Sequence, residues 1–336
     1  MNNPVLVEVT RGEQVESRHR GALAVVDAQG STVFSLGDIE HPVFPRSAVK
    51  ALQALPLVAS GAAERYGLTD AEIALACASH SGEPAHAETA ASALRKLGRD
   101  VGCLECGSHW PMDQKAAREL AATGGEPSAL HNNCSGKHSG FVCLACELDV
   151  DPAGYVRPDH KVQATVRGAL QEMTGARHSS ENYGIDGCSI PSYPVPLRAL
   201  AHGFARFGSG VDTPADYARA AQLIRAAVAA NPFMVAGTGR FDTRMMSQLG
   251  ARVFMKTGAE GVYCAAFPEL GCGVALKCDD GAGRAAEIVM ASMIRRFLPL
   301  DAGETALLHD VTAPVQKNWN GIAVGNLRPA RELLDA

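Results

Sequence analysis

Short apolar runs separated by turn-forming residues occur at both ends of the chain and predict β-strands. Residues 5–37 are expected to form strands, with the apolar run 22–26 separated from the run 32–36 by a turn at 27–30. The same pattern returns after Arg252. It predicts antiparallel strands at 253–256, 261–267 and 273–278, and a last strand at 321–324.

Between these regions, apolar residues recur at helical spacing. A helix is expected to begin near Pro45, a residue suited to a first turn, and to carry Ser47 through Val58, with Pro56 late in the pattern. The sequence Thr69-Asp-Ala-Glu72 matches a capping box and opens a short helix that ends at Cys77. Further helices are expected at 84–97, 112–122, 137–148, 159–173, 196–207, 214–230 and 284–297.

This order of elements predicts a mixed α/β protein of the α+β type. A central antiparallel sheet is expected from both chain ends, covered by a mostly helical region from the middle. We expect one domain over residues 1–336, with the sheet formed by about 1–45 and 250–330 and the helices by about 46–249. The sequence contains no internal repeat and no low-complexity tract.

Composition narrows the class of protein. Of 336 residues, 46% are hydrophobic and 20% are charged, which is enough apolar material for a sizeable core. The net charge is -5 and the basic residues are scattered, so we expect no nucleic-acid partner. The sequence begins without the pattern of a signal peptide and has no apolar stretch long enough to span a bilayer. A cytoplasmic protein with no membrane partner is expected, and its ten cysteines should be reduced.

Two short motifs far apart in the chain carry the most chemical information. Ser47-Ala-Val-Lys50 places a hydroxyl and an amine one helical turn apart, and Lys256-Thr-Gly258 adds a second amine beside two small residues. Together they are two of the three marks of serine acyl-transfer enzymes such as β-lactamases and penicillin-binding proteins. A neutral lysine can remove the serine proton when burial and a neighbouring positive charge favour its deprotonation.

The same two motifs predict where an oxyanion would be stabilised. Ser47 lies near a helix N-terminus, where free N–H groups and the helix dipole favour negative charge. Its own N–H and that of Ala259 are the candidate oxyanion donors. The alternative is that Ser47 and Lys50 are ordinary residues of a first helical turn.

A third candidate hydroxyl lies in the loop Ala78-Ser-His-Ser-Gly82. Loops held between rigid elements often carry functional groups, so Ser79 could relay a proton or serve as a second hydroxyl. On local grounds alone, the favoured interpretation is a serine that caps the helix beginning near Glu83-Pro84.

Two polar loops hold candidate metal ligands. His131-Asn-Asn-Cys-Ser-Gly-Lys-His138 precedes an apolar helix and places Cys134 and Lys137 one turn apart. The loop 184–190 offers Asp186 and Cys188. Two thiolates from separate loops could hold a zinc ion. Two buried free cysteines and a helix cap are the equally weighted alternative.

Other cysteine and glycine patterns are weaker. Cys103/Cys106 and Cys143/Cys146 could form a four-thiolate zinc site, but the second pair lies in what resembles a buried helix face, where cysteine behaves as a small hydrophobe. Gly237-Thr-Gly239 is too short a glycine run to indicate a phosphate loop, and no strand is expected before it.

Taken together, these segments resemble the rhizobial-type, or class 3, L-asparaginases, over about residues 5–325. The segments that carry the resemblance are Phe44-Pro-Arg-Ser-Ala-Val-Lys50, Cys77-Ala-Ser-His-Ser-Gly-Glu83, Asn132-Asn-Cys-Ser-Gly-Lys-His138, Gly184-Ile-Asp-Gly-Cys188 and Lys256-Thr-Gly-Ala-Glu-Gly261. The resemblance implies a fold like that of serine β-lactamases, penicillin-binding proteins and glutaminases. It also implies hydrolysis of L-asparagine to L-aspartate and ammonia, and a homodimer. The resemblance implies nothing for the segments 175–182 and 301–319, which do not match the family clearly.

The resemblance further implies roles for individual residues. Two Ser–Lys pairs are implied, Ser47 with Lys50 and Ser79 with Lys256, although which serine attacks first stays open. One zinc ion per chain is implied near the active site. Its implied ligands are Cys134, Lys137 and Cys188, and the implied substrate-contacting or supporting residues are Arg46, His138, Asp186, Ala259 and Glu260.

Three alternatives to an L-asparaginase remain at this point. A β-lactamase-like or D-amino-acid peptidase activity is disfavoured by the absence of an export signal. A glutaminase is closer, because one methylene changes binding by only about 1–3 kcal/mol. A non-catalytic zinc- or amino-acid-binding protein that kept the fold is the third alternative.

Overall fold

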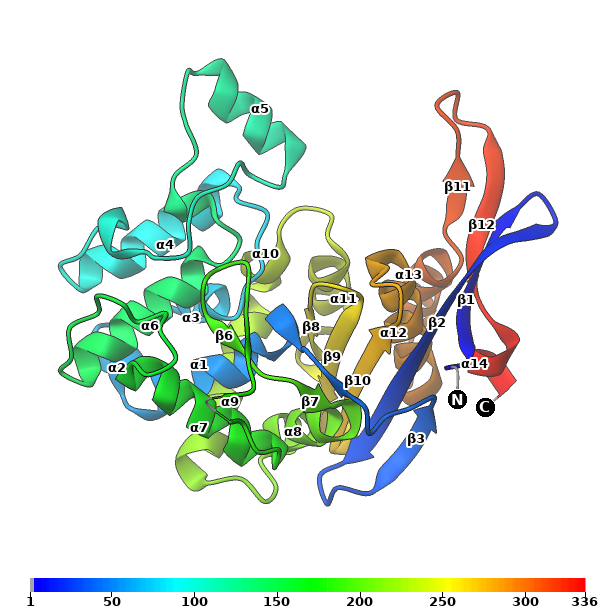
Figure 1. Ribbon diagram of the computed structural model, residues 1–336. Helices are drawn as coiled ribbons and strands as arrows, with labels where there is room; N and C mark the ends of the chain where they lie inside the picture. The colour runs from blue at the N-terminus through cyan, green and yellow to red at the C-terminus, as the bar shows by residue number, and fades with distance from the viewer. Residues whose placement is uncertain (1–2, 180, 336) are drawn as a thin grey trace.

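The computed structural model describes residues 3–179 and 181–335 and contains one large antiparallel sheet (Figure 1). Along the sheet the strands follow the order β11-β12-β1-β2-β10-β9-β8, and β3 also pairs with β2. The strands are β1 (Val5–Arg11), β2 (Gln14–Asp27), β3 (Thr32–Leu36), β8 (Phe254–Thr257), β9 (Val262–Phe267), β10 (Cys272–Cys278), β11 (Val315–Lys317) and β12 (Ala323–Pro329). The pairing of β1 with β12, with Val7 opposite Pro329, joins the two chain ends.

Helices cover the centre of this sheet on both faces. Strands β9 and β10 are buried along nearly their whole length, and both contact α8 (Leu197–Ser209) and α12 (Gly283–Phe297). On the α8 side, a Cβ atom at Gly273 of β10 would lie 2.0 Å from the carbonyl oxygen of Ala201. A residue without a side chain is therefore required at this position for the helix to approach the strand.

The helical region surrounds α1 (Lys50–Ala59), which is buried from Lys50 to Leu57 and contacts α3, α6, α7 and α9. The remaining helices are α2 (Ala62–Arg65), α3 (Asp70–Ala76), α4 (Pro84–Lys96), α5 (Gln114–Ala122), α6 (Ser135–Glu147), α7 (Lys161–Thr174), α9 (Ala215–Ala230), α10 (Pro232–Ala236), α11 (Phe241–Leu249), α13 (Ala302–Thr312) and α14 (Arg331–Asp335). This region also contains two short antiparallel strand pairs. They are β4 (Pro42–Val43) with β7 (Val195–Pro196) and β5 (Gly184–Ile185) with β6 (Pro191–Ser192).

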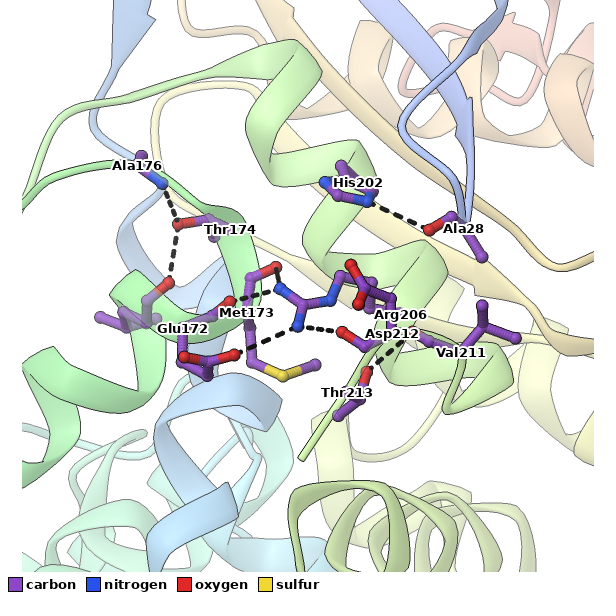
Figure 2. Close-up of polar contacts among 11 residues, drawn as sticks. Ala28, Glu172, Met173, Thr174, Ala176, His202, Arg206, Val211, Asp212 and Thr213 are labelled. Carbon is purple, nitrogen blue, oxygen red and sulfur yellow. Dashed lines mark hydrogen bonds and ion pairs between the residues drawn. The ribbon is translucent and has the colours of Figure 1, made fainter. Parts of the chain in front are cut away.

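A buried arginine joins the end of α7 to the end of α8. Figure 2 shows the guanidinium of Arg206 donating to the backbone carbonyls of Glu172, Met173 and Asp212, and pairing with the Glu172 carboxylate at 3.2 Å. The carbonyls at the C-terminus of a helix lack intrahelical partners, and the helix dipole favours a cation there. Arg206 therefore stabilises both the end of α7 and the loop that follows α8. We call these contacts the Arg206 clamp.

The expected architecture is confirmed: a sheet built from both chain ends and a mostly helical middle. The helix expected from Pro45 begins instead as a 3-10 segment, Arg46–Val49, and becomes α-helical at Lys50. The last strand, expected at 321–324, is β12, which extends to Pro329 because it pairs with β1. Among the described residues, no helix has both the length and the apolar character needed to cross a membrane.

Candidate active site

The hydroxyl of Ser79 lies between two buried lysines. Its Oγ atom is 2.9 Å from Nζ of Lys50 and 2.9 Å from Nζ of Lys256, and neither lysine side chain is exposed to solvent. Burying two amines is unfavourable unless they are neutralised or hydrogen-bonded. A hydroxyl shared by two such amines can pass a proton from one to the other, so the three groups form a possible proton path.

Three separate parts of the fold position these groups. Lys50 is the first residue of α1, Lys256 lies on β8, and Ser79 follows α3 in a loop. The N–H of Ser79 donates to the carbonyl of Val235, and the N–H of His80 donates to the carbonyl of Asn133, which fixes the loop. The convergence therefore depends on how α1, β8 and this loop pack together.

Lys256 is the lysine whose charge is most perturbed. Burial lowers its pKa to about 7, the carboxylate of Asp242 opposes this shift, and the charge of Lys50 adds to it. An amine with a pKa near neutrality is partly unprotonated at physiological pH and can accept a proton. The buried site thus supplies a base without any histidine.

The end of β8 lies directly against the segment that carries Ser47. A Cβ atom at Gly258 would lie 2.7 Å from the carbonyl oxygen of Pro45 and 3.2 Å from the backbone nitrogen of Ala48. The glycine of the Lys-Thr-Gly motif therefore allows the two backbones to approach. Ser47 is half-buried and one turn before Lys50, whose backbone N–H donates to the Ser47 carbonyl. The Lys50 amine is directed to the carbonyl of Ala78, to Ser79 and to Cys134.

Unusual backbone conformations gather around this segment. Among the described residues, five non-glycine residues have positive φ, and three of them lie here: Arg46 (51°), Glu260 (59°) and Ser189 (75°). Such conformations are unfavourable for non-glycine residues and persist where the surrounding structure imposes them, often at functional sites. Arg46 precedes Ser47, Glu260 follows Ala259, and Ser189 follows Cys188.

A cavity of about 800 Å³ opens beside these residues, and we call it the catalytic cavity. Its wall includes Arg46 and Glu260, together with Phe44 and Gly184. Arg46 donates to the Asp186 carboxylate at 3.1 Å, and although burial opposes the shift, this hydrogen bond lowers the pKa of Asp186. The cavity wall therefore presents the guanidinium of Arg46 and the carboxylate of Glu260, and Arg46 also binds Asp186.

Two thiols and a third lysine lie on the other side of Lys50. Lys137 donates to Sγ of Cys188 at 2.9 Å, and Lys50 donates to Sγ of Cys134 at 3.0 Å. A hydrogen bond from Cys188 lowers the pKa of Cys134, aided by the charges of both lysines. Burial opposes the shift at Lys137, but the two thiols raise its pKa. Cys134, Lys137 and Cys188, expected from separate loops, are thus brought together.

His138 lies on the interior side of α6. Its Nδ1 atom is 2.6 Å from the Tyr155 hydroxyl, which accepts a hydrogen bond from the N–H of Glu105. The Nε2 atom is buried without a partner among the described residues. Burial lowers the pKa of His138 well below its usual value, so the ring is neutral. No contact between His138 and either serine is recorded among the described residues, so its role as a substrate contact stays a prediction.

The chain matches the family described as L-asparaginase II over residues 7–329. The chain belongs to the L-asparaginase II family. The membership expected from the motifs is confirmed, and it makes the protein an amidohydrolase acting on a small molecule. No curated protein matches the chain.

Several solved structures are similar in fold. The β-lactamase/D-alanine carboxypeptidase of Pseudomonas syringae is 12% identical, with a TM-score of 0.43 over 83% of this chain and 94% of that one. A β-lactamase of Mycobacterium bovis is 12% identical, with a TM-score of 0.37 over 80% and 89%. An octameric penicillin-binding protein homologue of Pyrococcus abyssi is 13% identical, with a TM-score of 0.31 over 82% and 73%.

One local interpretation of this family member's sequence is wrong, and one disfavoured alternative finds no support. Ser79 does not cap α4, because Glu83 holds that position without a side-chain hydrogen bond and the Ser79 hydroxyl is engaged by lysines. The four-thiolate site is also absent, since no described group of three or more His, Cys, Asp or Glu residues could hold a metal. All ten cysteines are free.

One residue of the candidate site was not predicted from the sequence. The carboxylate of Asp242 accepts from the N–H of Thr257 at 3.0 Å and from the Tyr263 hydroxyl at 2.6 Å, and it raises the pKa of Lys256. Asp242 is buried in the first turn of α11. No side chain caps that helix, so nothing in the local sequence indicated a helix or an acid at the site.

Proposed function

We propose that this protein hydrolyses the side-chain amide of L-asparagine to L-aspartate and ammonia. The observation that carries the proposal is the Ser79 hydroxyl held between the buried amines of Lys50 and Lys256. Lys50 lies one helical turn after the half-buried Ser47, which follows the cavity-lining Arg46. Family membership supports the amidohydrolase class. An activated serine needs a base within reach, and this arrangement supplies one.

Accessibility favours Ser47 as the attacking serine. Ser79 is 7% exposed and enclosed by the two lysines, whereas Ser47 is half-buried and follows Arg46, which lines the catalytic cavity. A substrate amide must reach the nucleophile to within about 3–3.5 Å. In this mechanism Ser47 Oγ attacks the amide carbon, and Ser79 serves as a relay. Attack by Ser79, with Lys256 as its base, is the alternative within the same site.

The proton released by Ser47 passes along the lysine–serine–lysine path. Protonated Lys50 gives one proton to Ser79 and accepts the proton of Ser47 in its place. Ser79 in turn gives its own proton to the neutral amine of Lys256. One proton has then moved from Ser47 to Lys256, and every intermediate group keeps its original charge. Reversal of the path returns the proton to the leaving nitrogen and releases ammonia. Water then hydrolyses the acyl-enzyme by the same route.

Backbone groups would stabilise the negative oxygen formed during attack. The candidates are the N–H groups of Ser47 and Ala259, on the two segments that Gly258 allows to approach. Two such donors aimed at the developing charge are typical of acyl-transfer sites, and losing one costs about 2.7–4 kcal/mol. The positive φ of Arg46 and Glu260 holds these segments in a conformation the chain would not adopt alone.

Charged groups of the cavity wall, and Asp186 beside it, would bind the amino-acid part of the substrate. Arg46 can pair with the α-carboxylate in a bidentate manner. Asp186 and Glu260 can accept hydrogen bonds from the α-ammonium group. The cavity of about 800 Å³ is larger than asparagine requires, so the charges, and not the enclosed volume, would select the substrate.

The cluster of Cys134, Lys137 and Cys188 fits a zinc ion. Two buried thiols and an amine form a soft sulfur–nitrogen donor set, and one thiol is already acidified. These three residues would hold the ion, with Lys137 losing its proton on binding. A bound zinc ion supplies positive charge that neutralises the thiolates and fixes the two loops relative to Lys50. Serine, base and oxyanion donors form a complete set without it.

The proposal is tested by measuring ammonia release from L-asparagine by the purified full-length protein, with L-glutamine and nitrocefin in parallel. Asparagine should be turned over much faster than the other two, and Ser47→Ala should abolish turnover. Faster release from glutamine would establish a glutaminase, and nitrocefin turnover a β-lactamase-like enzyme. A folded, zinc-loaded protein that releases no ammonia from either amino acid would show a binding protein. We also expect a homodimer, measured by light scattering after size-exclusion chromatography.

A further inference from the structure

A second cavity, of about 320 Å³, lies where α11 and α12 begin. We call it the arginine pocket. Its wall is formed by the start of α11, the first turns of α12, the end of α13 and one residue of β12, and it includes three arginines. None of its lining residues lines the catalytic cavity. Gly239, the last residue of the segment Gly237-Thr-Gly239, also lines the pocket.

The three arginines, Arg240, Arg244 and Arg284, form no ion pair within 4.0 Å among the residues that the structure describes. Of these three arginines, Arg284 donates a side-chain hydrogen bond from Nε to Nε2 of His19, at 3.2 Å. Other arginines of the chain, such as Arg206, Arg252 and Arg328, are paired with carboxylates. Three guanidiniums therefore share this pocket without a close ion pair, an arrangement that can receive an anion.

Backbone groups add to this positive potential. Arg240 is the N-cap residue of α11, which has 9 residues, and Arg284 lies in the first turn of α12, which has 15. The first N–H groups of a helix lack intrahelical acceptors, and the helix dipole places partial positive charge there. Two helix N-termini therefore lie at the same pocket as three arginines.

Two acidic residues also line the pocket, but they do not cancel its charge. Burial and the charge of Asp242 raise the pKa of Glu287 to about 7, although the charges of Arg240 and Arg244 oppose this shift. Even with both acidic residues ionised, three guanidiniums outnumber two carboxylates in the wall. Asp310 is exposed and lies 3.8 Å from the ring of His309. The pocket thus keeps a net positive charge.

The remaining wall is apolar. Phe241, Ile288, Val311 and Leu327 line the pocket and are each less than 10% exposed. A bare phosphate ion would leave this apolar surface uncovered, whereas an ester with a small organic group would cover it. A volume of about 320 Å³ is at the lower end for binding a small molecule.

We propose that the arginine pocket binds a small organic phosphate monoester, with its phosphate on Arg240, Arg244 and Arg284 and its organic part on the apolar wall. A phosphate monoester carries a charge of about −1.5 to −2 at neutral pH and three acceptor oxygens, which matches three guanidiniums. The pocket shares no residue with the proposed catalytic groups, although the charge of Arg240 contributes to the lowered pKa of Lys256.

Isothermal titration of the full-length protein at constant ionic strength tests the site, with phenyl phosphate and inorganic phosphate as probes. Phenyl phosphate should bind with one site per chain and more tightly than inorganic phosphate. Arg244→Gln and Arg284→Gln should each weaken its binding by about tenfold or more, as expected for losing a charge-assisted hydrogen bond. Arg118→Gln, on the exposed surface of α5, is the matched control and should leave binding unchanged.

Three results would overturn the proposal. One is that phenyl phosphate at millimolar concentrations does not bind to protein whose melting temperature is normal. Another is binding that the two arginine variants do not weaken although both are folded. The third is equal affinity for phenyl phosphate and inorganic phosphate, which would show that the apolar wall contacts no ligand. Ammonia release, measured on the same samples, reports separately on the asparaginase proposal.

Discussion

Two clusters of buried cations in this molecule are built in opposite ways. In the Arg206 clamp, one guanidinium is satisfied by three backbone carbonyls and the Glu172 carboxylate (Figure 2). At the proposed active site, the amines of Lys50 and Lys256 share one neutral hydroxyl, and the only carboxylate that raises the pKa of Lys256 is that of Asp242. Both clusters are buried, but among the described residues only Arg206 is paired directly with a carboxylate, and its Nε atom has no partner. Lys50 and Lys256 have hydroxyl, carbonyl or thiol acceptors and no carboxylate within 4.0 Å among those residues.

This difference in acceptors distinguishes a buried cation that holds segments together from one that can transfer a proton. Arginine stays protonated in proteins, so a guanidinium with good acceptors is a permanent connection between segments. A lysine buried without a directly paired carboxylate can have a lowered pKa, as Lys256 has, and can then exchange its proton. We therefore expect changes in the clamp to alter stability and changes in the lysine–serine cluster to alter turnover.

The largest expected effect is that of Ser47→Ala. Without the attacking hydroxyl, ammonia release from asparagine should fall by roughly 10⁴-fold or more, as in other serine enzymes that lose their nucleophile. Ser60→Ala, at the other end of α1, is the matched control and should retain normal turnover. If Ser47→Ala kept a tenth of the activity while Ser79→Ala lost all of it, Ser79 would be the nucleophile.

The next effect is that of Lys256→Met, which removes the proposed proton acceptor while filling a similar volume. Turnover should fall by about 10³-fold, within the range of general-base catalysis. The free energy of unfolding should stay the same or increase, because a buried amine is replaced by an apolar group. A variant that unfolded at a much lower denaturant concentration would show that Lys256 is structural and would remove the contrast with Arg206.

Arg206→Met should have the reverse result. Carbonyls of Glu172, Met173 and Asp212 lose their donor, so we expect a loss of about 3 kcal/mol in the free energy of unfolding. Turnover of the folded fraction should change little. Arg198→Met on the same helix is the matched control: its pair with Glu40 is exposed, and its removal should cost less than about 1 kcal/mol. Equal losses in the two variants would contradict the clamp.

The pH dependence of turnover tests the role of Lys256 without a substitution. Because burial lowers the pKa of Lys256 to about 7, kcat/KM should rise about tenfold per pH unit below 7 and level off above it. The unfolded chain binds the proton of this lysine up to about pH 10.5, whereas the folded chain releases it near pH 7. Stability contributed by this group should therefore rise with pH between about 7 and 10.5. An activity that falls with pH across neutrality would contradict the proposed role.

The smallest expected effect is that of removing zinc. Chelation should weaken substrate binding several-fold, seen as a raised KM, and leave kcat nearly unchanged, because the ion is proposed to position loops and not to take part in the chemical step. Metal analysis of the purified protein should give one zinc per chain, reduced in Cys188→Ser. Loss of kcat on chelation would assign the metal a part in the reaction itself.

The sequence alone determined the features that depend on neighbours within one turn or one strand. The capping box of Thr69 and Glu72 and the alternating strands at both chain ends are local patterns, and both are present in the structure. The i, i+3 spacing of Ser47 and Lys50 placed a hydroxyl and an amine at the start of α1. A capping box that was overlooked, formed by Asp301 and Glu304, could have revealed α13 in the same way.

Only the tertiary structure decided which distant groups meet. Local sequence favoured Ser79 as a helix cap, but the packing of α1 and β8 places two lysines on its hydroxyl. Asp242 and the arginine pocket gave no local signal, because each depends on where α11 lies relative to β8 and α12. Local patterns are fixed by interactions over a few residues, whereas pKa values and pockets depend on burial and on neighbours remote in sequence, which exist only once the chain is folded.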